Sequence, residues 1–531
     1  MNSYVEKLNK FIISIKTEYL VFVLAFLYRF PNITSFVNDD DSLWKYRGYE
    51  FTTAMVNFNF ADTAITYHPG VPLLWSQMLA IKTYSVFDKL YFHGTLVGST
   101  EFFYNHLIQN IYLLTFNSLL ITFIFIFLRK VINEKYAIIA LLVIMLEPFF
   151  IALGRSIHND LLMSLFVFLT FLIFFQLMET YEKGNLYRRK MTWLMGIFSA
   201  MALLTKSGAL FMVPLFICTV IVFAFFDFKS IKRYLNVFIA WLLLSVLFFV
   251  IIWPAMWVNP GHTLWLYFYK GIFDTAIEDG HLHYWFGEIT MDPGFLFYPI
   301  VLVGRYTPVI IVGAIGGLVL FVATFFKHFK SKTIDKMDKF LLLNLVFFAG
   351  YFVMVSITSK KLDRYLLPEV FPLGVFTAYF VMYWFNKYRK YTVIAIVIFI
   401  ILRGITIAQI HPNYLVYYSP FIGGNDKGRF VIEPKWVIGF DKVADFLNAE
   451  QAKSGHKLLV VTPDAHILSY FAKFEPIYPD NPESRRGEYF VIPIWKPRSA
   501  IPMLEQYELT PDQLATKVYI GGVEYYDIYK K

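Results

Sequence analysis

The sequence predicts a polytopic α-helical membrane protein with about eleven transmembrane helices and a small C-terminal α/β domain. The chain of 531 residues is 57% hydrophobic and only 16% charged, and its mean hydropathy is +0.52. Several stretches of about 18 or more nearly uncharged residues are each long enough to cross a bilayer as a helix. The net charge of +9 does not indicate nucleic-acid binding, because the basic residues form short clusters between the apolar stretches, where membrane topology explains them.

The loops between the apolar stretches predict the orientation of the chain. Lysines and arginines cluster in every other loop once Lys206 is taken to split the apolar run 191–226 into two spans. We therefore expect a cytoplasmic N-terminus, retained as a signal anchor, and a C-terminus outside. Cys218 is the single cysteine, so no internal disulfide is expected. The predicted spans are approximately 11–30, 107–128, 135–153, 161–178, 191–205, 208–226, 233–254, 298–325, 338–358, 364–385 and 390–410.

Two long loops, residues 31–106 and 255–297, lie on the predicted outer side. We expect them to form the active site of a transmembrane domain that covers residues 1–410. After residue 411 Pro, Gly, Asp and Asn become frequent. A helical spacing at 439–451 and buried-strand patterns at 457–463, 488–495 and 517–522 predict an extracytoplasmic α/β domain over residues 411–531.

Three consecutive aspartates, Asp39 to Asp41, follow the first predicted span. Adjacent residues of a helix point about 100° apart, so three in a row cannot all face one site. An aspartate at the outer membrane boundary often marks a substrate site, where a partly desolvated carboxylate can act as a general base. Asp40 and Asp41 are therefore candidate catalytic residues, and the alternative is a solvated turn that caps a helix beginning near Ser42.

Two further motifs place polar side chains on the same side. "YHPGVPLLW" (67–75) presents His68 on a rigid turn, and "GRSIHND" (154–160) places Arg155, His158 and Asp160 in a short outside turn. A basic residue in so short an outside loop opposes the positive-inside bias, which favours a binding role for Arg155. The structural alternatives are an ordinary turn at His68 and a helix N-cap at Asp160.

Several other cations lie at the outer ends of predicted spans, where topology disfavours them. We expect cations held there to bind an anion, and arginine and lysine together suit a phosphate or pyrophosphate. The alternative for each is snorkelling to lipid headgroups. These residues are Lys206, Arg305, Lys360, Lys361 and Arg364.

"GHLHYWFGE" (280–288) offers His281 and His283 among aromatic residues. Alternate histidines with nearby carboxylates could bind a divalent metal, which stays possible but is not favoured, because no second close ligand pair follows. Hydrogen bonds from the histidines to a sugar that stacks on Tyr284 or Trp285 fit the sequence better. No cofactor is required by the sequence.

The ordered set of motifs resembles the protein O-mannosyltransferase-like enzymes, glycosyltransferase family 39 of the GT-C superfamily of polyprenyl-phosphate-sugar-dependent membrane glycosyltransferases. The aminoarabinose transferases of the same superfamily are a more distant likeness. The resemblance covers about residues 35–450. Its motifs are Asp40, Asp41, Trp44, Arg47, Asp62, Thr63, "YHPGV" (67–71), "GRSIHNDLLMSLF" (154–166), "LTKSGAL" (204–210), "MDPGFLFYPIVLVGRYTP" (291–308), "KKLDRYLLPEVFPL" (360–373) and "YYSPFIGG" (417–424).

The resemblance implies a polyprenyl-phosphate sugar donor, a catalytic carboxylate in the first outer loop, and outer-end cations that hold the phosphate. Asp40 and Asp41 match the acidic positions of the family. Arg47, Asp160, Lys206 and Arg364 match the supporting positions. Many relatives carry a Gly-Trp-Gly-Glu-Gly run late in the match, whereas residues 433–448 keep Trp436 and Gly439 and lack the glutamate.

The sequence therefore predicts an inverting glycosyltransferase that moves a sugar from a polyprenyl-phosphate donor to an acceptor hydroxyl at the outer membrane face. A protein, a glycan and a lipid all remain open as acceptors. The alternative is a transporter or flippase for a phosphorylated lipid, which should show matched half-repeats or charges in the middle of spans. The sequence shows neither feature, because its charged residues gather near one face.

Overall fold

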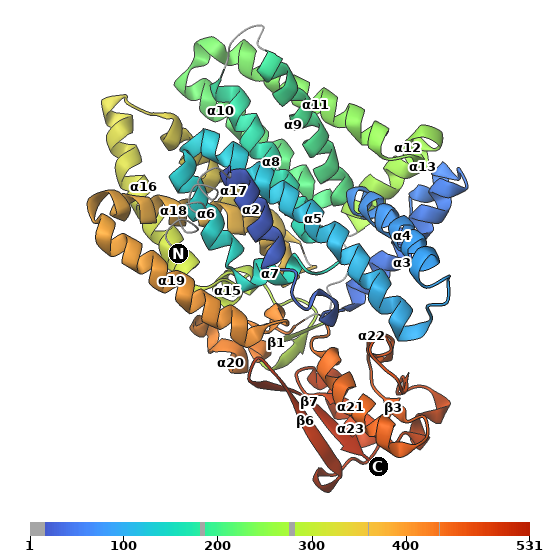
Figure 1. Ribbon diagram of the computed structural model, residues 1–531. Coiled ribbons are helices and arrows are strands. Elements are labelled where there is room, and N and C mark those ends of the chain that lie inside the picture. The colour runs from blue at the N-terminus through green and yellow to red at the C-terminus, as the bar shows by residue number, and fades with distance from the viewer. Residues whose placement is uncertain (1–15, 181–185, 275–281, 359, 435) are drawn as a thin grey trace, which may run out of the picture.

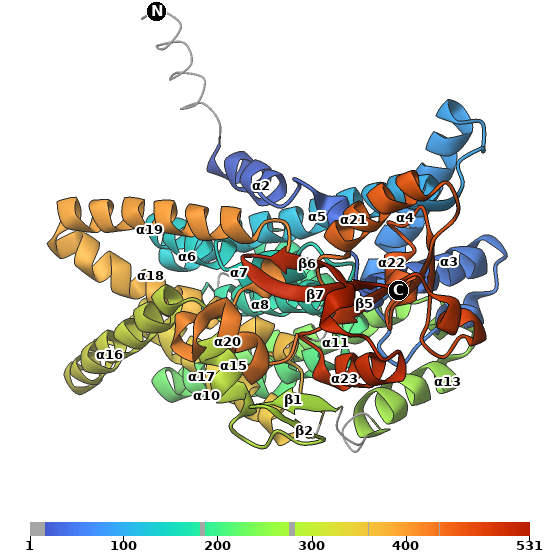
Figure 2. The same cartoon turned by 90° about the horizontal axis from the view of Figure 1, so that it is seen from below.

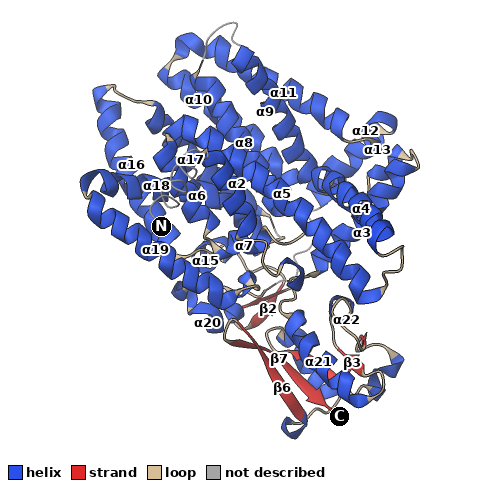
Figure 3. Ribbon diagram, viewed as in Figure 1, coloured by secondary structure: helices blue, strands red, loops and turns tan. Residues whose placement is uncertain are grey.

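The computed structural model describes residues 16–180, 186–274, 282–358, 360–434 and 436–531. It is a bundle of long helices with a smaller sheet domain at one end (Figures 1 and 3). Eight described helical segments are long and apolar enough to cross a membrane, which confirms a polytopic helical membrane protein. They are Gly98–Ile132 (α5), Asn159–Glu179 (α8), Ser207–Phe226 (η3 and α10), Phe228–Ile252 (η4 and α11), Pro308–Ser331 (α16), Lys336–Ile357 (α17), Asp363–Lys387 (η6 and α18) and Arg389–Ile410 (α19).

The predicted number of eleven spans is not confirmed. The other predicted spans fall on helices that are short, broken or partly charged: α2 (Thr17–Leu27), α6 (Glu134–Met145) with α7 (Pro148–Leu153), and α9 (Leu186–Thr205). Part of the span 11–30 lies outside the described residues. The predicted span 298–325 is two helices, α15 (Phe297–Arg305) and α16, because Pro308 lacks an N–H to continue the first helix and begins the second.

Helix α8 lies at the centre of the bundle and every residue of its apolar window is buried (Figure 1). It packs against α5, α9 and α10, and its phenylalanines stack on neighbours: Phe174 lies 4.0 Å from Phe216 of α10, and Phe168 lies 4.5 Å from Phe371 of α18, between ring centroids. Helix α19 has the same mean hydropathy of 2.5 but only 6% of its window is buried. Figures 1 and 2 show it at the edge of the bundle.

The two long loops that the sequence predicts on the outer side are partly helical. The first forms η1 (Ile33–Ser35), α3 (Asp39–Val56), η2 (Phe60–Thr63) and α4 (Val71–Tyr91), and α4 packs against both α3 and α5. The second forms α12 (Ala255–Val258), α13 (Pro260–Trp265), the π-helix η5 (Leu266–Asp274) and a hairpin of β1 (His283–Trp285) and β2 (Glu288–Thr290).

The C-terminal part contains the predicted small α/β domain. It follows η7 (Tyr414–Val416), η8 (Pro420–Ile422) and α20 (Gly424–Val431). Its sheet has the order β4-β3-β5-β7-β6, with β4, β3 and β5 parallel and β7 antiparallel to both neighbours. The elements are α21 (Phe440–Ser454), β3 (Leu459–Val461), α22 (Ala465–Leu468), β4 (Glu475–Ile477), η9 (Pro482–Arg486), β5 (Tyr489–Pro493), α23 (Pro497–Gln506), η10 (Pro511–Gln513), β6 (Leu514–Ile520) and β7 (Val523–Lys530).

Helix α3 begins at the three aspartates because Asn38 caps it. The Asn38 side chain accepts from the backbone N–H of Asp41 at 3.0 Å, and the Asp41 carboxylate accepts from the backbone N–H of Asn38 at 2.9 Å. This reciprocal capping box satisfies two backbone donors. The other oxygen of Asp41 accepts from the backbone N–H of Ile157, so this fully buried carboxylate also ties α3 to the turn before α8.

Helices α16 and α18 approach each other through small residues. Gly313 and Gly317 lie one turn apart on α16, and a Cβ atom at Gly317 would lie 2.0 Å from the backbone oxygen of Phe376 on α18. Glycines with this spacing allow close helix contact in membranes, where dispersion and packing replace the hydrophobic effect. Gly404 on α19 has nothing within 4 Å of the corresponding position.

We expect Gly317→Ala to destabilise the protein by about 1–3 kcal/mol, because the added methyl group forces α16 away from the backbone of α18. Thermal unfolding of the detergent-solubilised protein measures the loss. Gly404→Ala is the matched control and should leave the melting temperature unchanged. Equal melting temperatures for both variants would contradict the close contact.

We expect Asp41→Ala to destabilise the protein by about 1–3 kcal/mol, because it removes the capping box and leaves the buried N–H of Ile157 without its acceptor. Asp445 is an exposed aspartate of α21, and Asp445→Ala should change stability by less than about 0.5 kcal/mol. The two variants are compared by the same thermal unfolding measurement. An Asp41→Ala protein as stable as the control would contradict the structural role of this carboxylate.

Candidate active site

A charged cavity lies where α3, the turn before α4, the start of α8 and η6 meet. This first cavity has a volume of about 150 Å³ and is lined by Asp40, Arg47, His68, Lys206 and Arg364, among others. A second cavity of about 250 Å³ adjoins it and shares His68, Lys206, Lys360 and Tyr365 with it. Its remaining lining is mostly apolar and includes Met163, Leu210, Met354 and Val355. A charged cavity and a mostly apolar cavity therefore lie side by side and share four lining residues.

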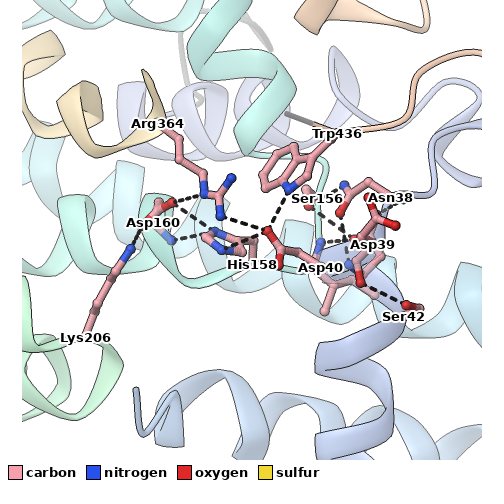
Figure 4. Close-up of polar contacts among 12 residues, drawn as sticks. Asn38, Asp39, Asp40, Ser42, Ser156, His158, Asp160, Lys206, Arg364 and Trp436 are labelled. Carbon is pink, nitrogen blue, oxygen red and sulfur yellow. Dashed lines mark hydrogen bonds and ion pairs between the residues drawn. The ribbon is translucent and has the colours of Figure 1, made fainter. Parts of the chain in front are cut away.

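Asp40 lies at the second position of α3 and projects into the charged cavity, and its side chain is 20% exposed (Figure 4). Its Oδ2 atom accepts a hydrogen bond from the indole N–H of Trp436 at 2.6 Å. The same oxygen lies 3.2 Å from Nη2 of Arg364 and 3.5 Å from Nε2 of His158. Among the described residues, none is hydrogen-bonded to the other oxygen, Oδ1, which leaves it for a ligand in the cavity.

Asp160 lies at the start of α8 and connects two cations. Its Oδ1 accepts from Nζ of Lys206 at 2.6 Å, and its Oδ2 lies 3.2 Å from Nε of Arg364. Arg364 thus bridges Asp160 and Asp40 (Figure 4). These buried charges are all paired, which is the condition for holding them at the end of an otherwise apolar bundle.

The electrostatic surroundings keep Asp40 ionised. Burial raises the pKa of its carboxyl, but Arg364, His158 and the Trp436 hydrogen bond together outweigh burial and hold the pKa below its usual value. Burial lowers the pKa of His158 to about 4 despite the neighbouring carboxylates, so this histidine is neutral at neutral pH. Burial and the cations Lys206 and Lys360 also hold the pKa of His68 well below its usual value.

The cations of the site exceed its carboxylates. Arg47, Lys206, Lys360 and Arg364 line the two cavities, against the carboxylates Asp40 and Asp160. Three of these cations also contact aromatic faces: Arg47 lies 4.6 Å from the ring of Trp44, Lys206 lies 4.2 Å from that of Tyr365, and Arg364 lies 4.8 Å from that of Trp436. Four positive against two negative side chains leave the space suited to an anionic ligand.

The structure brings together six of the predicted site residues and places five others elsewhere. Asp40, Arg47, His68, Asp160, Lys206 and Arg364 line the cavities. Asp41 faces the turn before α8 rather than the cavity. Arg155 donates to the backbone carbonyls of Arg29, Pro31 and Asn32 at 2.7–2.8 Å.

The remaining predicted cations and His283 also make contacts outside the cavities. Arg305 lies 2.7 Å from Asp363 and donates to the carbonyl of Leu415 at 2.9 Å. Lys361 pairs with Asp292 at 2.8 Å. His283 is buried with its ring 5.5 Å from that of Phe297, and His281 lies outside the described residues. Among the described residues, no three histidine, cysteine or acidic side chains group as a metal site.

The site also contains residues that were not predicted as site residues. Trp436 and His158 contact Asp40, and Tyr365 lines both cavities together with Lys360, which is one of the cations that the sequence predicted to bind an anion. Lys360 carried the same signal as Lys206, a cation at the outer end of a span. The only sequence signal for Trp436 was its position in a motif late in the chain. Nothing in the local sequence indicates that residue 436 contacts residue 40.

Comparisons with known proteins find one family model and several solved structures that are similar to this chain. Residues 78–264 match the model of the family described as "Dolichyl-phosphate-mannose-protein mannosyltransferase". No curated protein sequence matches the chain. The crystal structure of ArnT from Cupriavidus metallidurans bound to undecaprenyl phosphate has a TM-score of 0.52 at 10% identity, and the match covers 97% of each chain.

Two other crystal structures are similar at lower scores. ArnT from the same organism in the apo state has a TM-score of 0.49 at 12% identity over 98% of each chain. The apo oligosaccharyltransferase from Archaeoglobus fulgidus has a TM-score of 0.48 at 13% identity, over 90% of this chain and 70% of that one. Residues 78–264 are therefore similar to the dolichyl-phosphate-mannose-protein mannosyltransferase family, and the chain shares the fold of ArnT along nearly its whole length.

Proposed function

We propose that the protein transfers a sugar from a polyprenyl-phosphate donor to an acceptor hydroxyl at the outer membrane face, with inversion at the anomeric carbon. One observation carries this proposal: the ionised carboxylate of Asp40 and four cations line one cavity, and a mostly apolar cavity adjoins it. A lipid-linked donor needs a cationic pocket for its phosphate beside an apolar path for its lipid. Its transfer reaction needs a base beside both.

The donor phosphate would lie near Arg47, Lys206 and Lys360, in the charged cavity. Their positive charge would stabilise the phosphate as it leaves with the electrons of the bond to the sugar. His68 is buried between these cations, and as a neutral ring it can hydrogen-bond to the phosphate or to the sugar without adding charge. The apolar side chains of the second cavity would contact the first part of the polyprenyl chain. The crystal structure of ArnT, which has a similar fold, contains bound undecaprenyl phosphate, and this supports a polyprenyl phosphate as the ligand.

Asp40 would act as the general base. Its Oδ1 would take the proton of the acceptor hydroxyl while the hydroxyl oxygen attacks the anomeric carbon and the polyprenyl phosphate departs from the opposite side. Oδ2 is held by Trp436 and Arg364, so the carboxylate has a fixed orientation at the moment of transfer. Asp160 would act by orienting Lys206 and Arg364 rather than by touching the reacting atoms.

The proposal includes the orientation of the chain. The basic loops would lie in the cytoplasm, and the cavities and the C-terminal domain would lie outside. A transporter or flippase is not favoured, because the charges of the site gather at one end of the spans instead of following a path through them. The sugar and the class of acceptor are left to experiment.

We expect Asp40→Asn to lower turnover by about 10²–10⁴-fold, because the amide cannot accept the acceptor proton. Loss of labelled sugar from a radioactive polyprenyl-phosphate sugar that the wild-type protein uses measures turnover, whichever acceptor receives the label. Glu101→Gln removes an exposed carboxylate from the same outer loop and is the matched control, expected to keep wild-type turnover. Full activity of the Asp40→Asn protein at equal expression would remove Asp40 from the mechanism.

We expect Lys206→Met to lower kcat by about 10²–10³-fold, because the leaving phosphate loses one fixed positive charge. Lys206→Arg should keep part of the activity, since it keeps the charge but changes the geometry. Lys82 is an exposed lysine of α4, and Lys82→Met is the control for loss of a surface cation. The same assay compares them, and a fully active Lys206→Met protein would contradict a phosphate-stabilising role.

A further inference from the structure

We propose that Trp436 is a positioning residue for Asp40 and that the docked C-terminal domain holds Trp436 in place, so that turnover depends on the contacts of this domain with α3 and α5. The inference rests on the proposed role of Asp40 as the base. It assigns a role in the reaction to a domain that lies outside the transmembrane bundle. Three sets of contacts support it.

The first set surrounds the Trp436 side chain, which is 5% exposed. Its indole N–H donates to Oδ2 of Asp40 at 2.6 Å, its ring lies 4.8 Å from the guanidinium carbon of Arg364, and its centroid lies 5.3 Å from that of His158 (Figure 4). Trp436 therefore touches both groups that flank Oδ2. A hydrogen bond from a fixed donor restricts rotation of the carboxylate and keeps Oδ1 towards the cavity.

The second set ties Trp436 to the sheet of the C-terminal domain. Ile438 is fully buried, and its carbonyl accepts from the hydroxyl of Tyr526 on β7 at 2.7 Å. Gly439 has a φ of +79°, and a Cβ atom there would lie 1.9 Å from Ile520 of β6. The backbone after Trp436 thus lies directly against the sheet. Any displacement of the sheet must move the indole.

The third set docks the domain onto the outer helices. His466 of α22 lies 3.0 Å from Asp39, the residue before the proposed base. Tyr470 stacks on Phe102 of α5 with ring centroids 3.9 Å apart, and Nζ of Lys45 on α3 lies 3.9 Å from the Phe102 ring. At the other end of the sheet, the turn at Gly521 packs against Val416. The domain is therefore held at two separate places.

Charged and titratable groups face Asp40 from each surrounding element, and Trp436 adds a neutral donor to them. They are Arg47 of α3, His158 and Asp160 at the start of α8, Arg364 of η6, and Lys206 and Lys360 across the cavity, whereas the chain neighbours Asp39 and Asp41 turn to His466 and to the backbone of Ile157. Removing the indole donor leaves all of these groups in place. It should raise the pKa of Asp40, because the ionised form loses a hydrogen bond.

Trp436→Phe tests the role of the donor, since it keeps an aromatic ring beside Arg364 and removes the N–H together with the rest of the five-membered ring. We expect kcat to fall by about 10–100-fold, with a smaller change in the KM for the donor lipid. The acid limb of the pH profile of kcat/KM should move to higher pH by about one unit, because the base is active only when deprotonated. Trp495 is buried in the same domain, and Trp495→Phe is the control for disturbance of its core.

Tyr470→Leu tests the coupling through the domain, since it removes the stack on Phe102 without touching the cavity. We expect it to lower kcat and to move the acid limb in the same direction as Trp436→Phe, by a smaller amount. Thermal unfolding shows whether each variant is folded, and Tyr470→Leu tests the inference if Trp436→Phe is not.

The outcomes separate this inference from the proposed function. An Asp40→Asn protein without activity, together with Trp436→Phe and Tyr470→Leu proteins whose acid limb is unmoved, would overturn the positioning role and leave the base assignment intact. An active Asp40→Asn protein would overturn the base assignment itself. A shift in the Trp495→Phe control as large as that of Trp436→Phe would also overturn the inference, because the effect would then be a general response to loss of domain stability.

Discussion

The pairing of Asp160 with two cations is the interaction on which the site depends. Helix α8 is apolar along its whole buried length, and a charge at its end is tolerated only with close partners. Lys206 and Arg364 meet this condition from two other segments of the chain, and Arg364 extends the network to Asp40. The ion pairs of Asp160 with Lys206 and Arg364 therefore hold three distant parts of the sequence together. The first cavity lies beside this point.

The same network separates the roles of the aspartates at the start of α3. The helix begins at Asp39 instead of near Ser42, because Asn38 supplies the cap. Asp41 then completes the capping box, Asp39 meets His466 of the C-terminal domain, and Asp40 faces Arg364. The helical rotation between adjacent residues explains why only one of the three reaches the cavity. The local sequence shows that rotation, but it does not show where the helix starts.

Much of the class and part of the site could be predicted from the sequence. Hydropathy indicated the membrane bundle, and cations at the outer ends of spans led to Lys206 and Arg364. The same signal could not separate these from Arg155, Arg305 and Lys361, whose partners are distant carbonyls and carboxylates. One of the eleven predicted spans, 298–325, is interrupted before Pro308 in the structure. A hydropathy profile does not show this interruption. The contact of Trp436 with Asp40 could not be predicted from the sequence, because it forms only when the C-terminal domain packs against the bundle.

Helices α8 and α19 are equally hydrophobic, yet one is enclosed by protein and the other faces the surroundings of the bundle. A position that faces lipid tolerates any apolar side chain, whereas a position packed against other helices tolerates only side chains of a matching shape. Amino-acid substitutions should therefore accumulate faster along α19 than along α8, although the two helices have the same mean hydropathy. An alignment of relatives would record this contrast as one variable and one constrained stretch, and the constrained stretch ends at the carboxylate that organises the site.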